Sequence, residues 1–527
     1  MDFLIHRMLR TSAARQPDKE ALVHRDERLG YAEMAQRVNG LACGLREAGV
    51  ERRDRVGIFL DHSVPLALSI FAVSQAGGVF VPINAVLYPD QVGHIANDCQ
   101  MKGLITSTSK LPALAPVLAT VPSLQFLVIV DDGGSARADG VALPVHDFAR
   151  LSRPSAQACP DLGIDRDLAA LLYTSGSTGK PKGVMVTHAQ VMAGSSIVST
   201  YLGIAESERI LSVLPFSFDA GLNQLMTAVQ QGATCILTRF VFAREIVQVL
   251  ERERITGLAG VPTVWALLAQ PSSALARTPL PHLRYITNTG GRMPKAVLDQ
   301  LRKALPNAKV FLMYGLTEAF RSTYLPPEEV DRRPSSIGKA IPNTEILVIN
   351  DDGQPCKPGE VGQLVHRGPT VSSGYWGRTD LTNEVLRPHP LIPAELGGDE
   401  RVCYSGDLVT MDEDGFLYYI GRRDTMIKSS GFRISPTEVE EILFSSGRLR
   451  GAAVIGIPDD ILGQAVKAFV VAREGERLDT ASLMEFCATR MPRYMVPAAI
   501  EVLDELPKTG TGKVDYPALR RREGLAA

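Results

Sequence analysis

The chain lacks a hydrophobic run long enough to cross a membrane as a helix. No stretch of its 527 residues approaches the ~20 apolar residues that such a span needs, and the apolar run near Met1 is too short for a signal peptide. The seven cysteines are scattered and never form Cys-x-x-Cys. We therefore expect a cytoplasmic protein with reduced thiols and no membrane span.

An excess of charge of either sign is also missing. The 56 Lys and Arg residues against 58 Asp and Glu residues give a formal net charge of -2. So small a charge provides no long-range field for nucleic acid or an anionic membrane, so we expect no nucleic-acid partner and a local site for any polyanion. Internal repeats, heptad arrays and low-complexity tracts are absent from the sequence as well.

Short apolar runs alternate with helix-like stretches over much of the chain. The first series comprises residues 56–60, 79–83, 104–106 and 126–130, and the second 169–173, 209–214, 233–238, 285–289 and 310–314. This alternation predicts βαβ units and mainly parallel sheets. Between 341 and 422, runs separated by turns such as Asp-Asp-Gly predict a smaller, mostly antiparallel β unit.

A compact α+β segment is predicted to follow residue 423. Ser435-Pro-Thr-Glu438 combines a capping Ser, a Pro at the first helical position and a Glu three residues after the cap, so a helix is predicted there. The prediction is an α/β fold: a large N-terminal domain (1–423) of two layered α/β subdomains plus the small β unit, and a small C-terminal domain (424–527).

A glycine-rich loop follows the apolar run at 169–173. In Tyr173-Thr-Ser-Gly-Ser-Thr-Gly-Lys-Pro-Lys-Gly183, glycines let backbone amides turn toward an anion, while hydroxyls and lysines add donors and charge. A Walker A loop would continue from Gly-Lys into Ser or Thr and a helix, whereas Pro181 follows here and the next helix is predicted at Thr187. The loop predicts another kind of phosphate site, or, taken alone, a flexible surface turn.

The whole string resembles the signature of the adenylate-forming, or AMP-binding, superfamily of acyl-CoA synthetases, peptide-synthetase adenylation domains and luciferases. Further motifs follow in the family's order over nearly the whole chain. The resemblance implies an AMP-forming ligase that uses ATP and Mg²⁺ to turn a small carboxylic acid into an acyl-adenylate and then a thioester. The sequence around Gly315-Leu-Thr-Glu-Ala-Phe-Arg321 is most similar to that of exosortase-associated AMP-forming acyl-CoA ligases.

The resemblance implies contacts for each part of the nucleotide. Tyr314 offers a face for the base, Asp407 and Arg422 match ribose contacts, and Thr317 provides a hydroxyl for phosphate. Glu318 provides a hard oxygen ligand for Mg²⁺. The implied ATP or AMP contacts are Thr174, Ser175, Gly176, Ser177, Thr178, Lys182, Gly290, Gly291, Tyr314, Gly315, Asp407, Arg422 and Arg433.

The C-terminal domain is implied to be mobile and to provide a catalytic lysine. Lys513, in Pro507-Lys-Thr-Gly-Thr-Gly-Lys513, resembles the lysine that bridges the substrate carboxylate and the α-phosphate, where one cation helps two anions approach. Asp424 matches the hinge about which the domain rotates between half-reactions. Gly431 is implied to let a pantetheine pass the backbone.

The segment Leu214-Pro-Phe-Ser-Phe-Asp219 resembles the border of the acid pocket. Phe218 and Asp219 match a pair that, in amino-acid-activating relatives, places the Asp against the substrate ammonium; equally, Asp219 could cap the following helix. Arg292 follows two glycines where the family usually has a small apolar residue, so it either binds a second acidic group of the substrate or points to solvent. Phe320 and Arg321 leave the pocket's chemistry open.

Several interpretations remain open for the acceptor and the reaction. Coenzyme A and a phosphopantetheinyl carrier protein end in the same thiol, so an amino-acid-adenylating enzyme that loads a carrier is an alternative. A luciferase-like oxygenase would share every motif.

Overall fold

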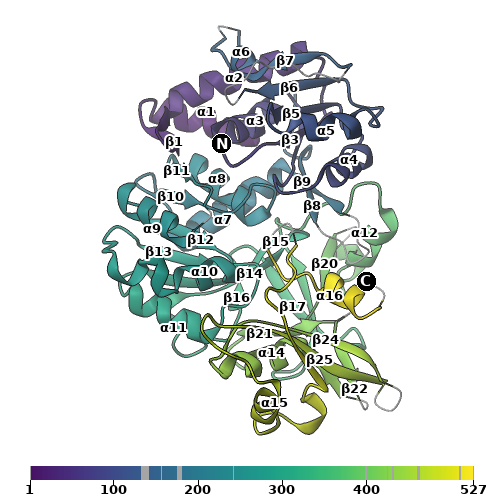
Figure 1. The fold of residues 1–527 in the computed structure, drawn as a ribbon. Coiled ribbons are helices and arrows are strands. Elements are labelled where there is room, and N and C mark those ends of the chain that lie inside the picture. The colour runs from purple at the N-terminus through teal and green to yellow at the C-terminus, as the bar shows by residue number, and fades with distance from the viewer. Residues whose placement is uncertain are drawn as a thin grey trace.

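The computed structural model describes residues 2–131, 142–155, 157–174, 181–240, 242–397, 400–423, 425–429, 432–459, 463–509 and 512–525, and within them the strands form four sheets (Figure 1). Some predicted site residues lie outside the described residues: Ser175, Gly176, Ser177, Thr178, Asp424, Gly431 and the side chain of Arg433.

The first sheet has the strand order β7-β6-β5-β3-β4-β8-β9 and is parallel except for the β8–β9 pair. It contains every strand predicted in the first series, and also the run at 169–173, which the sequence pattern places in the second. Its elements are β3 (Arg55–Phe59), α3 (Val64–Gln75), β4 (Val79–Pro82), α4 (Pro89–Asp98), β5 (Gly103–Ser107), α5 (Leu111–Leu118), β6 (Phe126–Val130), β7 (Val145–Asp147), α6 (Phe148–Leu151), β8 (Leu168–Thr174) and β9 (Lys182–Thr187).

The second sheet has the order β16-β15-β14-β13-β12-β10-β11-β1-β2, with parallel pairing from β14 through β1. The helix predicted at Thr187 is α7, which begins with a capping box formed by Thr187 and Gln190. The elements are α1 (Ile5–Arg15), β1 (Glu20–His24), β2 (Glu27–Gly30), α2 (Tyr31–Glu47), α7 (His188–Leu202), β10 (Arg209–Ser212), α8 (Asp219–Gln231), β11 (Thr234–Leu237), α9 (Ala243–Arg252), β12 (Gly257–Gly260), α10 (Pro262–Leu268), β13 (Tyr285–Asn288), α11 (Lys295–Ala304), β14 (Lys309–Leu316), β15 (Ala319–Leu325) and β16 (Lys339–Ala340).

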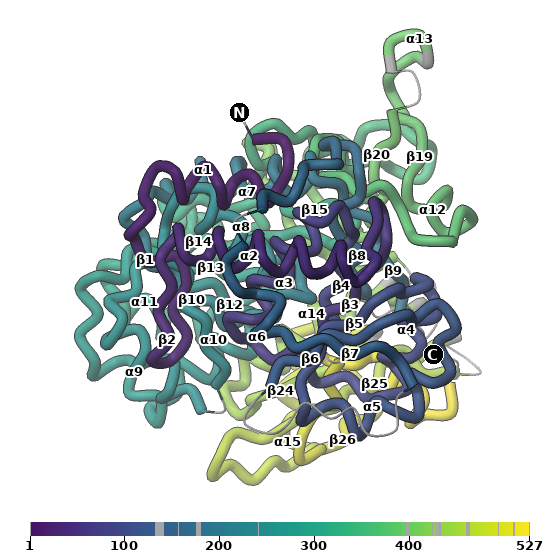
Figure 2. Tube along the Cα trace, turned by 90° about the horizontal axis from the view of Figure 1, so that it is seen from above, coloured from purple at the N-terminus to yellow at the C-terminus, as the bar shows by residue number. Residues whose placement is uncertain are grey.

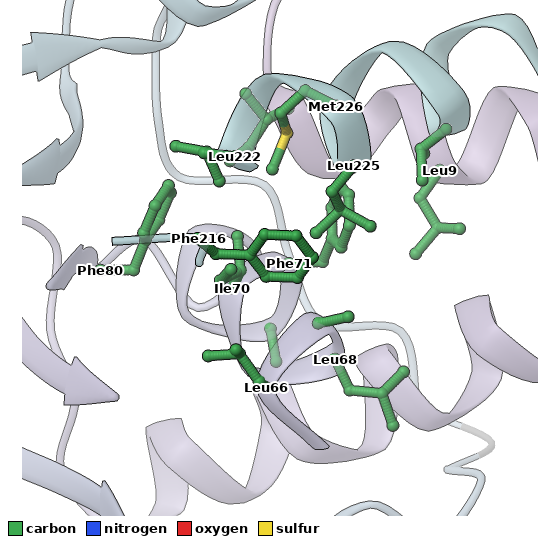
Figure 3. Close-up of a cluster of buried hydrophobic side chains, with 14 of the residues drawn as sticks. Leu9, Leu66, Leu68, Ile70, Phe71, Phe80, Phe216, Leu222, Leu225 and Met226 are labelled. Carbon is green, nitrogen blue, oxygen red and sulfur yellow. The ribbon is translucent and has the colours of Figure 1, made fainter. Parts of the chain in front are cut away.

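Helices of these two layers share one hydrophobic core. Figure 3 shows Phe71 of α3 beside Phe216 and beneath Leu222 and Leu225 of α8, with Leu9 of α1 nearby. These side chains are almost fully buried. The shared core joins the two α/β subdomains, so the sheet edges that present the site are held together.

The small β unit is antiparallel, as predicted. Its strand order is β17-β18-β20-β19, with β21 paired to β20. The long strand β20 was not predicted. The elements are β17 (Glu345–Ile349), β18 (Gly362–Arg367), α12 (Thr379–Val385), β19 (Leu386–Pro388), α13 (Ala394–Gly397), β20 (Arg401–Met411) and β21 (Leu417–Arg422).

A fourth sheet is built from strands that all follow residue 423, with the order β23-β22-β25-β24 and β26 beside β25. Ser435 accepts a hydrogen bond from the Glu438 amide, which confirms the predicted helix start. In both views, α15, β24 and β25 gather at one end of the molecule (Figure 1, Figure 2). The elements are β22 (Ile427–Ser429), β23 (Phe432–Ile434), α14 (Pro436–Ser445), β24 (Leu449–Asp459), β25 (Gly463–Ala472), α15 (Thr480–Ala488), β26 (Ala499–Val502) and α16 (Tyr516–Arg522). Among the described residues, no helix is both long and apolar enough to cross a membrane.

Glu440 makes the stability of this last unit depend on pH. Its Oε1 accepts hydrogen bonds from the Val454 amide at 2.8 Å and the Tyr516 hydroxyl at 2.7 Å. Burial nevertheless raises the pKa of the Glu440 carboxyl from 4.5 to about 7. The protonated form therefore stabilises the fold below pH ~4.5, and that contribution is lost as pH rises through ~7.

We expect Glu440→Gln to flatten this dependence, because the amide is neutral at every pH and keeps the acceptor oxygen. Urea unfolding at pH 5 and pH 8 should show a loss of up to ~3 kcal/mol in the parent chain and a smaller loss in the variant. Glu438→Gln, on the exposed side of the same helix, is the control and should behave as the parent. Equal pH slopes for the parent chain and Glu440→Gln would contradict the assignment.

Candidate functional site

Side chains from several motifs converge where β13 and β14 end. These two strands are parallel, so Thr289, Gly290 and Gly291 after β13 lie at the same sheet edge as Thr317 and Glu318 after β14. Leu316 pairs with Ala319 across β14 and β15, which makes Thr317 and Glu318 the two-residue turn of a hairpin. The turn holds both side chains at the rim of the site.

Glu318 lies near β9, the strand that follows the predicted phosphate loop. The Tyr375 hydroxyl donates to Glu318 Oε1 at 2.5 Å, and Lys182 Nζ lies 5.7 Å from the centre of the Tyr375 ring. Thr174 and Lys182 face each other across β8 and β9. The two described ends of the loop are therefore on the same side of the site as Glu318.

A second group joins the large sheet to the small β unit. The Tyr314 hydroxyl donates to Asp407 Oδ2, and Arg422 Nε lies 3.4 Å from Asp407 Oδ1. The Tyr314 ring stacks on His366, with ring centres 6.1 Å apart. Burial and the Asp407 charge raise the pKa of Tyr314 well above its usual value, so the phenol is a neutral donor.

Lys513 reaches from the C-terminal loop into this site. Its Nζ lies 5.5 Å from the centre of the Phe218 ring. A Cβ at Gly290, whose φ is 74°, would lie 3.4 Å from Lys513 Cε and 3.5 Å from the Phe218 ring. The structure thus brings together Lys513, Phe218 and Gly290, which the sequence places far apart.

Asp219 is the first residue of α8, directly after the N-cap Phe218. Burial raises the pKa of its carboxyl, and the nearby Arg321 and Lys513 charges oppose that rise, as do the amides of Asp219 and Ala220. No side-chain cap hydrogen bond is present at the start of α8, so the capping interpretation depends on attraction between the carboxylate and the first helix amides, whereas the electrostatic interaction with Lys513 fits the pocket interpretation. The two are compatible in this geometry.

Arg292 forms an ion pair with Glu441 of α14, so the guanidinium joins the two domains. Burial lowers the pKa of Arg292. The side chain is not among those that line the cavity between α7, α8 and the second sheet. In this conformation the Arg292 charge is paired with the other domain, an arrangement that neither sequence interpretation predicts.

A cavity between α7, α8 and the second sheet contains polar residues that the sequence analysis missed. Asn223, Gln224 and Thr227 line it from α8, and Thr287 and Arg321 line it from the sheet. A sequence signal was present, because Asp219, Asn223 and Thr227 follow one another at intervals of four on a helix and therefore share a face. Tyr375 and His366 were missed as well, because they lie outside the motifs.

The donor set near the loop fits a magnesium ion better than a transition metal. Within the described part of the chain, no group of three or more His, Cys, Asp or Glu residues is placed to hold a metal. Mg²⁺ is usually held by one or two carboxylates together with substrate phosphates and waters. Glu318 with a bound nucleoside triphosphate would provide such a set.

Family comparisons match both parts of the chain. The model for the AMP-binding enzyme matches residues 9–376, and the model for the AMP-binding enzyme C-terminal domain matches residues 438–513. The first match contains all strands of the two large sheets, and residues 377–437, which include Asp407 and Arg422, lie between the two matches.

Individual relatives are similar over almost the whole length. A feruloyl-CoA synthase of Amycolatopsis sp is 34% identical over 97% of this chain and 97% of the relative. Tyrocidine synthase 3 of Brevibacillus parabrevis is 30% identical over 97% of this chain but only 8% of that protein.

Solved structures share the fold. The anthranilate CoA ligase AuaEII in complex with anthranoyl-AMP has a TM-score of 0.88 and 25% identity over 99% of this chain and 97% of its own. The O-succinylbenzoate coenzyme A synthetase MenE from Bacillus subtilis, in complex with ATP and magnesium, has a TM-score of 0.80 and 26% identity over 96% of this chain and 98% of its own.

Gly315 is required by a close backbone approach in the site. A Cβ there would lie 2.8 Å from the Arg321 amide nitrogen and 2.9 Å from its Cα. We expect Gly315→Ala to destabilise the protein by ~1–3 kcal/mol through overpacking, measured by urea unfolding. The control is Gly163→Ala, where a Cβ meets nothing nearer than 3.5 Å. Equal stability of the two variants would show that the backbone can move to accommodate a Cβ at residue 315.

Proposed function

We propose a mechanism from one premise: this chain belongs to the AMP-binding enzyme family. It is an AMP-forming acid–thiol ligase that activates a carboxylic acid with ATP and Mg²⁺ and transfers the acyl group to a pantetheine thiol, that of coenzyme A. The observation that carries the mechanism is the position of Lys513, which reaches the other domain beside Phe218, Asp219 and Gly290.

In this mechanism the nucleoside is held between the second sheet and the small β unit. Asp407 accepts hydrogen bonds from the ribose hydroxyls, and Arg422 holds the Asp407 carboxylate in position. The 3.4 Å distance between Arg422 Nε and Asp407 Oδ1 supports these two roles. Tyr314 hydrogen bonds to Asp407 and offers its ring to the base. Gly315 lets the strand pass close to the Arg321 backbone, and Gly290 and Gly291 leave room for the nucleotide.

The phosphates bind the loop from Thr174 to Lys182 and the hydroxyl of Thr317. In this proposal, the phosphates are also contacted by Ser175, Gly176, Ser177 and Thr178. Glu318 would hold Mg²⁺, which would neutralise phosphate charge. The Tyr375 hydroxyl orients the Glu318 carboxylate through its 2.5 Å hydrogen bond.

In the first half-reaction a carboxylate oxygen of the acid attacks the α-phosphorus of ATP. The bond from that phosphorus to the bridging oxygen breaks, and pyrophosphate leaves. Lys513 lies between the two anions and offsets their repulsion as they approach, which is worth most in a site that excludes water. The Phe218 ring holds the Lys513 ammonium at the border of the acid pocket.

In the second half-reaction the C-terminal domain rotates about Asp424, with 423/424 as the boundary, and Lys513 withdraws. The Arg292–Glu441 pair, which joins the domains in the present conformation, must break. The thiol then passes Gly431, with Arg433 near the phosphate, attacks the acyl carbon and releases AMP.

We expect Lys513→Ala to slow adenylation by at least ~10²–10³-fold and to leave thioester formation from presynthesised acyl-adenylate nearly unchanged. Pyrophosphate release and thioester formation measure the two steps separately. The control is Lys508→Ala, which removes an exposed lysine of the same loop paired to Glu505 and should affect neither. Equal loss of both half-reactions in Lys513→Ala would refute the assignment.

A second candidate is an amino-acid-activating enzyme that loads a carrier protein. The buried Asp219 carboxyl beside Lys513 favours it, because a carboxylate in such a place is costly unless it is paired, here with the substrate ammonium. The N-terminal position of Asp219 on α8 explains its burial equally well. A carrier's pantetheine would use the same thiol route as coenzyme A.

Acid-dependent exchange of labelled pyrophosphate into ATP separates these candidates. If an amino acid is the substrate, Asp219→Asn should reduce kcat/KM for that acid by ~10²-fold or more, because one partner of a buried charge pair is lost, while a deaminated analogue is little affected. Repeating thioester formation with coenzyme A and with a carrier identifies the acceptor. Similar losses for an acid and its amino derivative would assign Asp219 to the helix cap instead.

A further inference from the structure

The cavity between α7, α8 and the second sheet has a mostly apolar lining that is interrupted by several polar side chains. Asn223, Gln224, Thr227, Thr287 and Arg321 contribute to its wall. Arg321 is 4% exposed and Gln224 is 7% exposed. Burying such groups against hydrocarbon costs free energy unless they find hydrogen-bond partners, so this polar part of the wall favours a ligand that carries a polar group.

Two of these side chains have polar atoms left over. Arg321 Nη1 donates to Thr289 Oγ1 at 2.7 Å, and Gln224 Nε2 donates to the Leu211 carbonyl at 3.1 Å. Arg321 Nε and Gln224 Oε1 have no hydrogen-bond partner among the described protein atoms. The cavity wall therefore offers one unused donor on a cation and one unused acceptor.

The backbone holds Arg321 in a conformation that a side chain adopts only under constraint. Its φ is 51°, in the left-handed region that favours glycine, so the surrounding structure must hold the residue there. The β14–β15 register shifts between Tyr314 and Leu316, and Gly315 lies against the Arg321 backbone at this bulge. Bulges next to active sites commonly redirect a side chain; here the result is a guanidinium facing the cavity.

Charges are placed in sequence along this side of the site. Lys513 lies at the pocket border, Asp219 is within electrostatic reach of both Lys513 and Arg321, and Arg321 lines the cavity beyond. An acid that reaches from Lys513 into the cavity would place its other end near Arg321. The guanidinium forms its strongest hydrogen bonds with carboxylate oxygens.

We propose that the substrate is a short carboxylic acid that carries a second oxygen-acceptor group, a carboxylate or carboxamide, at the end remote from the reacting carboxyl, and that Arg321 binds this group. The proposal rests on the function proposed above, because it assumes that the cavity receives the acid. An unsubstituted hydrocarbon acid of the same length would leave Arg321 Nε unpaired and buried.

The test is pyrophosphate–ATP exchange with length-matched acids. One set comprises succinate, glutarate and their monoamides; the second aspartate, glutamate, asparagine and glutamine; the third butyrate and valerate. We expect kcat/KM at least ~10²-fold higher for an acceptor-bearing acid than for its hydrocarbon match, since a site built for a polar group rejects the analogue that lacks it. The first and second sets show whether an amine is also required.

Arg321→Met should remove this preference, lowering kcat/KM for the acceptor-bearing acid by ~10²-fold with little change for the hydrocarbon acid, and Arg321→Lys should retain part of it. Arg332→Met, at an exposed arginine paired to Glu329, is the control and should match the parent. The acid comparison in the parent enzyme tests the proposal even if the Arg321 variants fold poorly.

Hydrocarbon acids used as well as their acceptor-bearing matches would overturn the proposal and leave the ligase function intact. A preference that survives Arg321→Met in folded protein would overturn the role of Arg321. Absence of exchange with every acid would instead count against the proposed function itself.

Discussion

Adenylation requires a carboxylate and a triphosphate, both anions, to approach within bonding distance, and the rest of this structure is arranged around that repulsion. The cation that lies between them in our account, Lys513, belongs to a different domain from the groups that bind either anion. It approaches Gly290 closely enough that even a Cβ there would touch its side chain. In our account, the reactive arrangement therefore exists only while the two domains are placed in this way.

The remaining parts of the site follow from where sheets end. Parallel strands β13 and β14 present Thr289 to Gly291 and the Thr317–Glu318 turn at one edge. The small β unit supplies Asp407 and Arg422 as neighbours across β20 and β21. The core shared by α1, α3 and α8 fixes the first sheet, with the two described ends of the proposed phosphate loop, against the second (Figure 3). The site is thus a product of four sheets meeting.

Much of this could be predicted from the sequence because the signals were local. The capping box at Thr187, the cap at Ser435 and the apolar runs of the parallel sheets each lie within a few residues of the structure they specify. Strand β12 was missed because Gly257-Leu-Ala-Gly260 has no β-branched residue; its first glycine is needed where a Cβ would clash with Tyr285. Strand β20 was obscured by Tyr404-Ser-Gly-Asp407, where Gly406 has a φ of 76°.

Features of the site that depend on distant pairs could not be predicted. Arg292 and Glu441 are far apart in sequence, and no local pattern relates them. Arg321 faces the cavity because of a bulge and a left-handed φ, and neither is visible in the residue types around it. The polar face of α8 at Asp219, Asn223 and Thr227 was visible as a four-residue spacing, but its meaning depends on which sheet the helix covers.

The central claim is that the present arrangement of domains is the one that forms the adenylate. The most direct measurement is a single-turnover assay on Arg292→Cys/Glu441→Cys, joined by a short bis-maleimide between the two positions that pair in this structure. The account predicts that the cross-linked enzyme releases pyrophosphate at a rate close to that of the uncross-linked double variant, yet forms no thioester. Thioester formation at the uncross-linked rate, or loss of pyrophosphate release on cross-linking, would contradict it.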